Sequence, residues 1–405
     1  MERYVCFRPE YVGGFQCDGI LCQSRCCRDW GVTLDPATLT KYRNIQDPGI
    51  RGEILSHVKA TEEDGLYIEL RENGWCSFLR EDYLCKLQKE LGEEYLSCTC
   101  RTFPRVIYRI GDLLEQSLSL ACPVAAERIL RSRESMAFEQ VELTVGEPIV
   151  VRRPPSSAAL AILPEMQYAC ISLLQDRRFP IDGRLALVGS FLEQAQYFLE
   201  EGQLEKLEQL AAFYGAEDIY EQGKLLFRAI RFHSRRWAKS LAFFMAVLLE
   251  AERSCGTEDL PLQRVREMFG EAHGVLEDKL EAFGDGEYFP LREGIMKRHA
   301  HILENYLVNE FFLNIYPLRI QGTLLENFHG FLLSYKLLEL ILAAEARMQG
   351  GELDEEILVG LLEDFAYRMD HGAVHIGCVK EMVLKEKVGL APLLNTFLQD
   401  AVGVL

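Results

Sequence analysis

The sequence predicts an α+β protein that is mostly α, with a small cysteine-rich antiparallel β module followed by a large helical bundle. Nine of the thirteen cysteines lie between residues 15 and 123, and a tenth, Cys6, lies just upstream. Alternating apolar runs flank a two-residue turn signal at Gly111 and Asp112, which predicts a β-hairpin. After residue 157 the chain changes to long segments with apolar residues three and four apart, a pattern typical of packed helices.

The first part of the chain, residues 1–150, is predicted to be the cysteine-rich module. Asp35 and Pro36 supply an N-cap and a proline at the first helical position, which predicts a short helix over residues 34–43. Residues 65–70 alternate as a strand, RVIYRI and LLEQSLSL form the hairpin, and residues 138–145 add another strand. We expect the thiols to lie on loops of this sheet. Paired prolines predict a linker over residues 150–157.

The remaining residues, 151–405, are predicted to form a helical domain that contributes to cofactor and substrate binding. Two segments, residues 184–202 and 203–215, each end at a glycine and predict a helical hairpin. Further helices are expected over residues 220–249, 261–272, 291–315, 323–348, 354–369 and 378–388. We find no fixed repeat period among them, so a helical bundle is favoured over a solenoid.

Length and charge narrow the class of protein. At 405 residues and 48% apolar, the chain can bury a large core. A formal charge of -18 disfavours nucleic acid as a partner, and we find no apolar run that approaches the roughly 20 residues of a membrane helix. The N-terminus lacks the apolar segment of a signal peptide, so we expect a cytoplasmic protein. The charge serves solubility alone or steers a cationic partner to an acidic surface that includes residues 352–356.

The cysteine cluster predicts a metal centre or a redox site, because thiols stay reduced in the cytosol. The one histidine before Cys122 is His57, so an all-thiolate site is favoured, which suits zinc or an iron–sulfur cluster. Buried thiols without metal are the alternative. The candidate ligands are Cys17, Cys22, Cys26, Cys27, Cys76, Cys85, Cys100 and Cys122. These are twice as many as one four-thiolate site needs. Because consecutive side chains diverge, we expect Cys26 or Cys27 to be structural.

The cysteine positions also match a longer pattern, F-x-C-x4-C-x3-CC-x2-W, then C-x-F-L, C-R-x-F-P-R and a final C-P. This pattern resembles a cysteine-cluster domain associated with zinc or iron chelation, and within that group the chain is most similar to the flagellin lysine-N-methylases. The residues that carry the resemblance are Phe15, Cys17, Cys22, Cys26, Cys27, Trp30, Cys76, Phe78, Leu79, Cys85, Cys100, Phe103, Pro104, Arg105, Cys122 and Pro123. Residues 302–317, ILENYLVNEFFLNIYP, resemble a helical signature of the same enzymes.

The resemblance implies a function. It implies methyl transfer from S-adenosylmethionine to lysine side chains of flagellin, by an enzyme that carries a [4Fe-4S] cluster. We therefore expect a protein-lysine N-methyltransferase with flagellin as its protein partner. The alternative is a zinc- or iron–sulfur-binding module that senses redox state or docks a partner without catalysis. Thiolate ligands suit zinc and iron–sulfur alike, so both metals stay open.

A polar stripe interrupts the apolar segment over residues 296–317. His301, Asn305 and Asn309 recur at i, i+4 and i+8, with Glu304 and Tyr306 beside them. Such a stripe is typical of the solvated edge of an amphipathic helix, or of a surface that grips a small polar ligand. The resemblance favours the ligand, so we predict that Glu304, Asn305, Tyr306 and Asn309 line a site for S-adenosylmethionine.

Two motifs of other S-adenosylmethionine enzymes do not occur. We find no G-x-G-x-x-G after a strand, so the doubly wound nucleotide fold is not indicated. The radical pattern C-x3-C-x2-C fails because Asp29 stands where the third cysteine would be. Direct attack by a lysine amine, whose reference pKa is about 10.4, needs desolvation or a base such as a tyrosine or a carboxylate.

A further basic cluster, RMDHGAVH, contains Arg368, His371 and His375. Gly372 makes a continuous helix through it less favourable, so we predict that these side chains satisfy carbonyl groups at a helix end. A catalytic base or a ligand trio is the alternative.

Overall fold

The computed structural model describes residues 2–19, 22–61, 65–145, 151–154, 157–216, 219–221, 223, 237–242, 265, 267–268, 284–319 and 322–371. The chain divides into two compact units. The cysteine-rich unit comprises Met1–Ile129, Ala137–Arg153 and Glu363–Gly372, and the helical unit comprises Leu130–Met136, Pro154–Leu362 and Ala373–Leu405. Helices outweigh two small sheets, which confirms the predicted fold class. The assignment of metal binding to residues 1–150 and of ligand binding to residues 151–405 stays a prediction.

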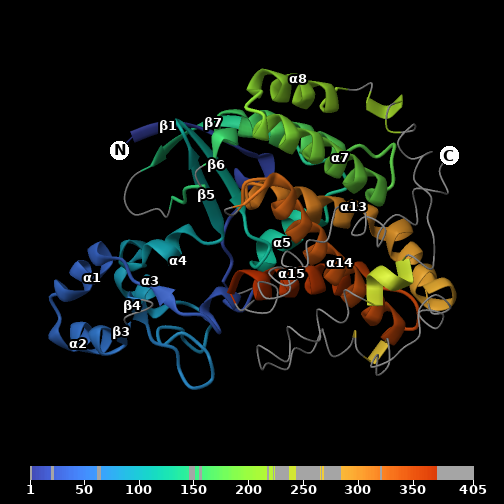
Figure 1. Cartoon of the computed structure of the whole chain (residues 1–405). Helices are drawn as coiled ribbons and strands as arrows, with labels where there is room; N and C mark the ends of the chain where they lie inside the picture. The colour runs from blue at the N-terminus through green and yellow to red at the C-terminus, as the bar shows by residue number, and fades with distance from the viewer. Residues whose placement is uncertain are drawn as a thin grey trace. The chain divides into compact units, whose positions relative to one another are not determined.

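The larger sheet of the cysteine-rich unit has the strand order β5-β6-β1-β7 (Figure 1). Its strands are β1 (Glu2–Pro9), β5 (Arg105–Ile110), β6 (Leu113–Leu118) and β7 (Phe138–Val145). The predicted hairpin is confirmed: β5 and β6 are antiparallel, and Gly111 turns between them with a φ of 60°. The strand predicted over residues 138–145 is β7. One detail differs from the prediction, because β1 pairs parallel to β6 and makes the sheet mixed.

The smaller sheet has the order β2-β4-β3 and lies in the segment that supplies most of the thiols. Its strands are β2 (Val32–Thr33), β3 (Val58–Thr61) and β4 (Gly65–Ile68). The neighbouring helices are α1 (Pro36–Arg43), α2 (Pro48–Ser56), α3 (Lys86–Leu91), α4 (Cys98–Thr102) and α5 (Pro123–Leu130), with 3-10 turns η1 (Glu10–Val12), η2 (Arg25–Cys27) and η3 (Glu93–Tyr95). Asp35 caps α1 through the amide of Thr38 at 2.9 Å, as the sequence predicts.

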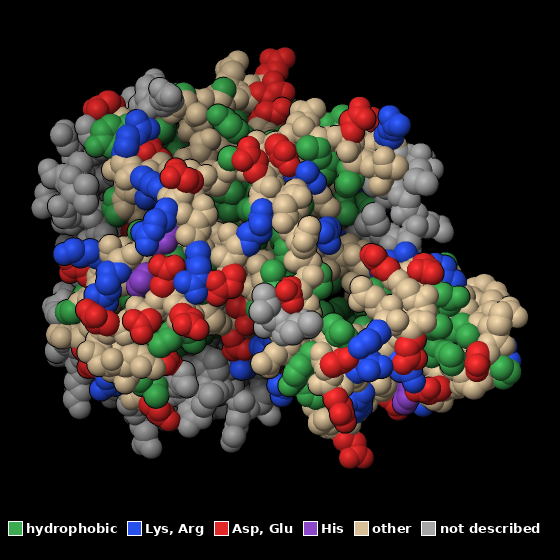
Figure 2. Space-filling model, turned by 180° about the vertical axis from the view of Figure 1, so that it is seen from behind, with side chains coloured by type: hydrophobic (Ala, Val, Ile, Leu, Met, Phe, Trp, Pro, Cys, Tyr) green, Lys and Arg blue, Asp and Glu red, His purple; other side chains and the backbone are tan. Residues whose placement is uncertain are grey.

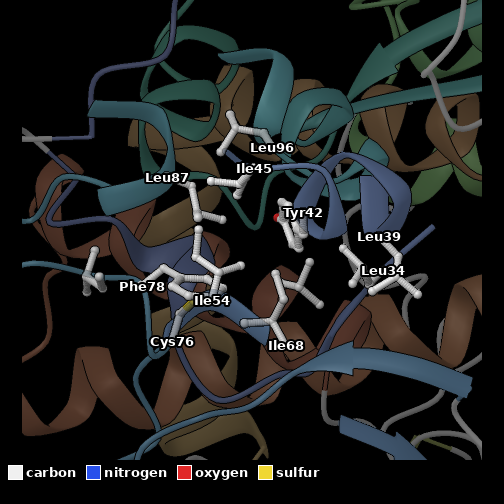
Figure 3. Packing of buried hydrophobic residues seen from close by; sticks show 12 residues of the cluster. Leu34, Leu39, Tyr42, Ile45, Ile54, Ile68, Cys76, Phe78, Leu87 and Leu96 are labelled. Atoms are coloured by element: carbon white, nitrogen blue, oxygen red, sulfur yellow. The ribbon is translucent and has the colours of Figure 1, made fainter. Parts of the chain in front are cut away.

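A compact apolar core joins α1, α2 and the smaller sheet to the cysteine-bearing loops (Figure 3). Tyr42 of α1 lies in this core at 0% exposure, and Cys76 lies in it at 7%. Cys27 and Cys85 pack against it and are partly buried. The side chains of Cys27, Cys76 and Cys85 therefore belong to the packed core of the unit or contact it.

The helical unit is built from long helices that pack in pairs. Its described elements are η4 (Ala158–Ile162), α6 (Leu163–Leu174), α7 (Ile181–Glu200), α8 (Leu204–Tyr214), a π-helical turn η5 (Gly284–Tyr288), α13 (Phe289–Leu313), α14 (Leu324–Met348) and the first part of α15 (Glu355–His371). The predicted hairpin is confirmed as α7 and α8, joined through Gly202 with a φ of 67° (Figure 1). The sequence analysis did not predict α6.

The predictions for the C-terminal helices hold where the structure describes them. Helix α14 starts at a capping box in which Thr323 and Glu326 satisfy each other's backbone amides, and it is buried around most of its circumference. Helix α13 kinks at His299, whose ring nitrogen lies 2.9 Å from the carbonyl oxygen of Leu353. The helix predicted over residues 378–388 lies outside the described residues, as do most of those over residues 220–249 and 261–272.

The predicted linker is described at residues 151–154 and 157. Arg152 forms a parallel bridge to Tyr108, so this part of it extends the edge of the larger sheet beside β5. Among the described helices, none combines the length and the apolar character that a membrane span requires.

Candidate functional site

The candidate cysteine ligands occupy turns and helix starts in the cysteine-rich unit. Cys26 and Cys27 end the short turn η2, Cys85 precedes α3, Cys100 lies in α4 and Cys122 precedes α5. Burial differs among the eight: Cys76 and Cys122 are buried, Cys17 and Cys100 are exposed, and Cys22, Cys26, Cys27 and Cys85 are intermediate.

The thiols of the adjacent residues Cys26 and Cys27 affect each other's pKa. A hydrogen bond from Cys27 lowers the pKa of Cys26, and the same bond, together with burial, raises the pKa of Cys27. Both residues lie in the tight 3-10 turn η2. Whether one of the pair is structural stays a prediction.

Backbone hydrogen bonds connect the first cysteine segment to the second. The amide of Cys76 donates to the carbonyl oxygen of Cys27 at 2.7 Å, and Arg28 forms an isolated bridge to Trp75. The segment then folds back on itself, because Leu79 forms a bridge to Cys85. The backbone of Cys27 is thereby held beside that of Cys76, about fifty residues later in the sequence.

The charge of Cys26 affects the pKa of each of the other seven candidate thiols. Burial raises the pKa of Cys76 to about 11 and of Cys122 to about 12, and negative charge on Cys26 adds to both shifts. Negative charge on Cys26 also raises the pKa of five other thiols, although another cause contributes more to each of these shifts. These are Cys17, Cys22, Cys27, Cys85 and Cys100. The structure thus gathers the predicted set around Cys26.

Backbone amides oppose the rise in thiol pKa at several of these positions. The amides of Leu87 and Gln88 act on Cys85 from the start of α3, although the Cys85 thiol makes no conventional capping hydrogen bond. The amides of Ala125 and Val124 act on Cys122 in the same way at the start of α5. Amides at a helix start stabilise the thiolate, which is the form of cysteine that binds metal.

The two metal alternatives place different demands on the spacing of the thiols. In the part of the chain that the structure describes, no group of three or more Cys, His, Asp or Glu side chains is placed to hold one metal ion. Zinc binds its ligands directly around a single ion, whereas an iron–sulfur cluster interposes iron and sulfide atoms, so its thiolates stand farther apart. Whether the unit binds zinc or an iron–sulfur cluster therefore stays open.

Tyr42 and Arg101 of this unit carry buried polar atoms that lack hydrogen-bond partners among the described residues. The hydroxyl of Tyr42 has none, and neither do Nε and Nη2 of Arg101, which stands next to Cys100. After burial, negative charges on Cys100, Cys85 and Cys76 raise the pKa of Tyr42. An unpaired guanidinium and an unpaired hydroxyl suit an anionic centre, such as a cluster held by thiolates.

The second part of α15, from Glu363 on, belongs to the cysteine-rich unit and holds the turn that carries Cys26. Arg25 lies 2.7 Å from Asp364 and 3.4 Å from Glu363, and its guanidinium stacks over the ring of Tyr367 at 4.1 Å. Tyr367 also donates its hydroxyl to the carbonyl of Arg28. The sequence analysis missed this contact, because it joins residues more than 330 positions apart and carries no local signal.

The structure describes part of the basic cluster of Arg368, His371 and His375, which was predicted to lie at a helix end. Arg368 pairs with Asp364 at 2.6 Å on its own helix, and α15 ends at His371. His375 lies outside the described residues. Its assignment therefore stays a prediction, as does the alternative of a catalytic base.

The polar stripe of α13 is buried rather than solvated. Asn305 is 1% exposed and Asn309 is 0% exposed, so the alternative of a solvated edge is wrong for these two residues. Asn305 donates to the carbonyls of Leu130 and Ser132, at 3.2 and 2.7 Å. Beside the stripe, Tyr306 is 4% exposed, and in the stripe Nε2 of His301 has no hydrogen-bond partner among the described residues.

Glu304, which lies beside the stripe, is engaged by arginines of the helical unit. Its carboxylate accepts hydrogen bonds from Arg184 at 2.6 Å and from Arg177 at 3.0 Å, and Glu304 is 2% exposed. Protein groups therefore already use the carboxylate of Glu304 and the amide of Asn305. Binding of S-adenosylmethionine by Glu304, Asn305, Tyr306 and Asn309 stays a prediction.

Comparison with known proteins identifies the class. Residues 167–393 match the model of the FliB lysine N-methylase C-terminal domain, which covers more than half of the chain. The chain belongs to this family of lysine N-methylases.

The curated relatives agree with the family. Proteins named lysine-N-methylase from Salmonella choleraesuis and Salmonella typhimurium are each 32% identical over 218 residues, which cover 52% of this chain and 53% of each relative. The flagellar biosynthetic protein FliU of Salmonella muenchen is 36% identical over 142 residues, 34% of this chain and 84% of that protein. The chain thus spans about half the length of the two lysine-N-methylases that it matches. No solved structure matches it.

Proposed function

We propose that the protein transfers a methyl group from S-adenosylmethionine to lysine side chains of a protein substrate. The observation that carries this proposal is the match of residues 167–393 to a lysine N-methylase domain, together with two relatives named lysine-N-methylase. In the reaction a neutral lysine nitrogen attacks the sulfonium methyl carbon. The new carbon–nitrogen bond forms as the carbon–sulfur bond breaks, S-adenosylhomocysteine leaves, and the nitrogen loses a proton.

We propose flagellin as the substrate. Support comes from the resemblance of the cysteine pattern to flagellin lysine-N-methylases and from a relative named a flagellar biosynthetic protein. The formal charge of -18 favours approach by a lysine-bearing surface. The predicted acidic stretch is only partly available for this, because Glu352 pairs with Arg298 at 2.8 Å and Glu355 with Arg131 at 3.1 Å. On the face drawn in Figure 2, basic and acidic side chains are interspersed among the described residues.

We also propose that the cysteine-rich unit binds a [4Fe-4S] cluster. Support comes from eight thiols coupled around Cys26 and from the orphaned polar groups of Tyr42 and Arg101. Four of the eight cysteines would hold the cluster, and the bound cluster would supply a cross-link between segments distant in sequence. The chain itself supplies the amides at the starts of α3 and α5, which stabilise thiolate ligands.

A methyl-transfer assay tests the proposed function. Protein purified without oxygen is incubated with flagellin and S-adenosylmethionine that carries a deuterated methyl group, and flagellin peptides are analysed by mass spectrometry. We expect a mass increase at lysine residues that depends on both enzyme and methyl donor. Flagellin with its lysine amines acetylated is the matched control and should remain unlabelled. Unmodified flagellin after incubation with iron-loaded protein that binds S-adenosylmethionine would contradict the proposal and favour a non-catalytic metal module.

A further inference from the structure

The hydroxyl of Tyr42 is the buried polar group of the cysteine-rich unit that is hardest to explain by protein contacts alone. Tyr42 is 0% exposed, and its hydroxyl has no hydrogen-bond partner among the described residues. An unsatisfied buried hydroxyl destabilises the fold, and buried tyrosines usually find a partner. Phenylalanine would fill the same space without this cost. The hydroxyl therefore points to a group that is bound within the unit.

Local structure places this hydroxyl among the candidate ligands. Tyr42 and Cys76 belong to the same buried cluster (Figure 3). Cys85 packs against that cluster. Asp35 joins two helices. One of its carboxylate oxygens caps α1, which carries Tyr42, and the other accepts a hydrogen bond from the amide of Cys98 at the start of α4, at 2.9 Å. Helix α4 carries Cys100. The first turns of the two helices are thereby held together.

From this placement we infer that Tyr42 donates a hydrogen bond to a sulfur of the cluster centre, on the side formed by Cys76, Cys85 and Cys100. The inference rests on the proposed cluster, and it assigns these three cysteines to one side of it. Thiolate and sulfide sulfurs accept hydrogen bonds, and such bonds raise the reduction potential of a cluster because they stabilise its more negative, reduced form.

The variant Tyr42→Phe tests the inference by two measurements on iron-loaded and metal-free protein. With the cluster bound, we expect its midpoint potential to fall by about 59 mV, which is a tenfold change in the ratio of reduced to oxidised protein for a one-electron couple. Without the cluster, we expect the variant to resist urea at least as well as the wild type, because it no longer buries an unpaired hydroxyl. A structural hydroxyl with a hidden partner would instead destabilise both forms alike.

The matched control is Tyr11→Phe in the same unit, because the Tyr11 hydroxyl already pairs with Ser117 at 2.8 Å. It should leave the potential unchanged. An unchanged potential in iron-loaded Tyr42→Phe protein would overturn the role of Tyr42 and leave the proposed cluster standing. Wild-type protein that contains zinc or no metal, by iron and sulfide analysis after anaerobic purification, would overturn the cluster and this inference together. Methyl transfer is measured separately, so its failure is distinguishable from both results.

Discussion

The two units differ in how some of their buried polar groups are satisfied. In the helical unit, Glu304 lies between Arg184 and Arg177, and a second buried group joins Arg292 to Glu339 at 2.8 Å. In the cysteine-rich unit, the Tyr42 hydroxyl and two nitrogens of Arg101 have no partners among the described residues, although thiols surround Tyr42. The helical unit also contains an unpaired buried atom, Nε2 of His301, so the missing partner of Tyr42 points to a ligand only because candidate thiol ligands belong to or pack against the same buried core.

The difference follows from the cost of burial. A charge removed from water is tolerated when hydrogen bonds and an opposite charge replace the lost hydration. Lys336 shows this in the helical unit, because it is 2% exposed and donates to the Tyr288 hydroxyl at 2.8 Å and to Glu339 at 3.2 Å. We therefore assign structural roles to these ion pairs and look for ligand chemistry in the cysteine-rich unit.

Removal of a thiol should give the largest effect and tests the comparison most directly. We expect Cys85→Ser and Cys100→Ser to lose most of the bound iron and to destabilise the cysteine-rich unit, because metal binding and folding are coupled. Iron and sulfide analysis, with thermal unfolding of the same samples, measures both effects.

The matched control is Cys170→Ala, because Cys170 lies in the apolar interior of α6 in the helical unit. It should keep its iron. Cys255 and Cys378 lie outside the described residues, and we expect them to be dispensable for metal binding as well. Full iron content in Cys85→Ser, with loss of iron in Cys170→Ala, would reverse the assignment of the metal to the cysteine-rich unit.

The second prediction concerns the paired charges of the helical unit. Replacement of Glu304 by glutamine leaves Arg184, whose side chain is 6% exposed, without its carboxylate. Removal of one partner of a buried ion pair costs roughly 3–5 kcal/mol, so we expect a loss of this size in the free energy of unfolding measured with urea. The iron content should not change.

The control for this pair is Glu352→Gln, since Glu352 pairs with Arg298 at the surface and its side chain is 76% exposed. Exposed pairs contribute about 0–1 kcal/mol, so this variant should unfold close to the wild type. Equal stability of Glu304→Gln and Glu352→Gln would mean that the paired charges of the helical unit do not carry the structural role given to them here.

The sequence predicted those elements whose signals are local. Asp35 and Pro36 marked the start of α1, Gly111 marked the hairpin, and Thr323 stood at the start of α14. The parallel pairing of β1 with β6 could not be predicted in this way, because it joins residues more than a hundred positions apart. Membership of α15 in both units was missed for the same reason.

For the candidate site, the sequence predicted the residue types better than their surroundings. The cysteine spacing pointed to the eight thiols that the structure gathers around Cys26. Periodicity located the polar residues of α13, but it could not show that Glu304 is enclosed by Arg177 and Arg184, which come from a segment more than a hundred residues away. Tyr42 had no signal at all, since a tyrosine on a helix face is ordinary until its hydroxyl is seen to lack a partner.

The third prediction has the smallest expected effect and concerns the carboxylate that holds α1 and α4 together. Burial alone would raise the pKa of Asp35, but hydrogen bonds from the Cys98 amide and from Thr38 outweigh it and lower the pKa to about 2. Since the pKa in the unfolded chain is about 3.9, the stability that Asp35 contributes is fully present above that pH and is lost as the pH falls through about 2.

We expect Asp35→Asn to cost about 1 kcal/mol at pH 7, because asparagine can still cap α1 but supplies a neutral and weaker acceptor for the Cys98 amide. The gap from the wild type should close between pH 4 and pH 2, where Asp35 becomes protonated, in unfolding monitored by fluorescence of the metal-free protein. Asp82→Asn is the control for surface charge, because Asp82 is exposed and its ion pair with Lys89 is screened by solvent, so this variant should lose little stability at any pH. A larger or equally pH-dependent loss in Asp82→Asn would show that general surface charge, rather than the link between α1 and α4, governs the acid stability of the cysteine-rich unit. A loss of stability in Asp35→Asn alone would instead show that the Asp35 carboxylate stabilises the unit by holding α1, which carries Tyr42, to α4, which carries Cys100.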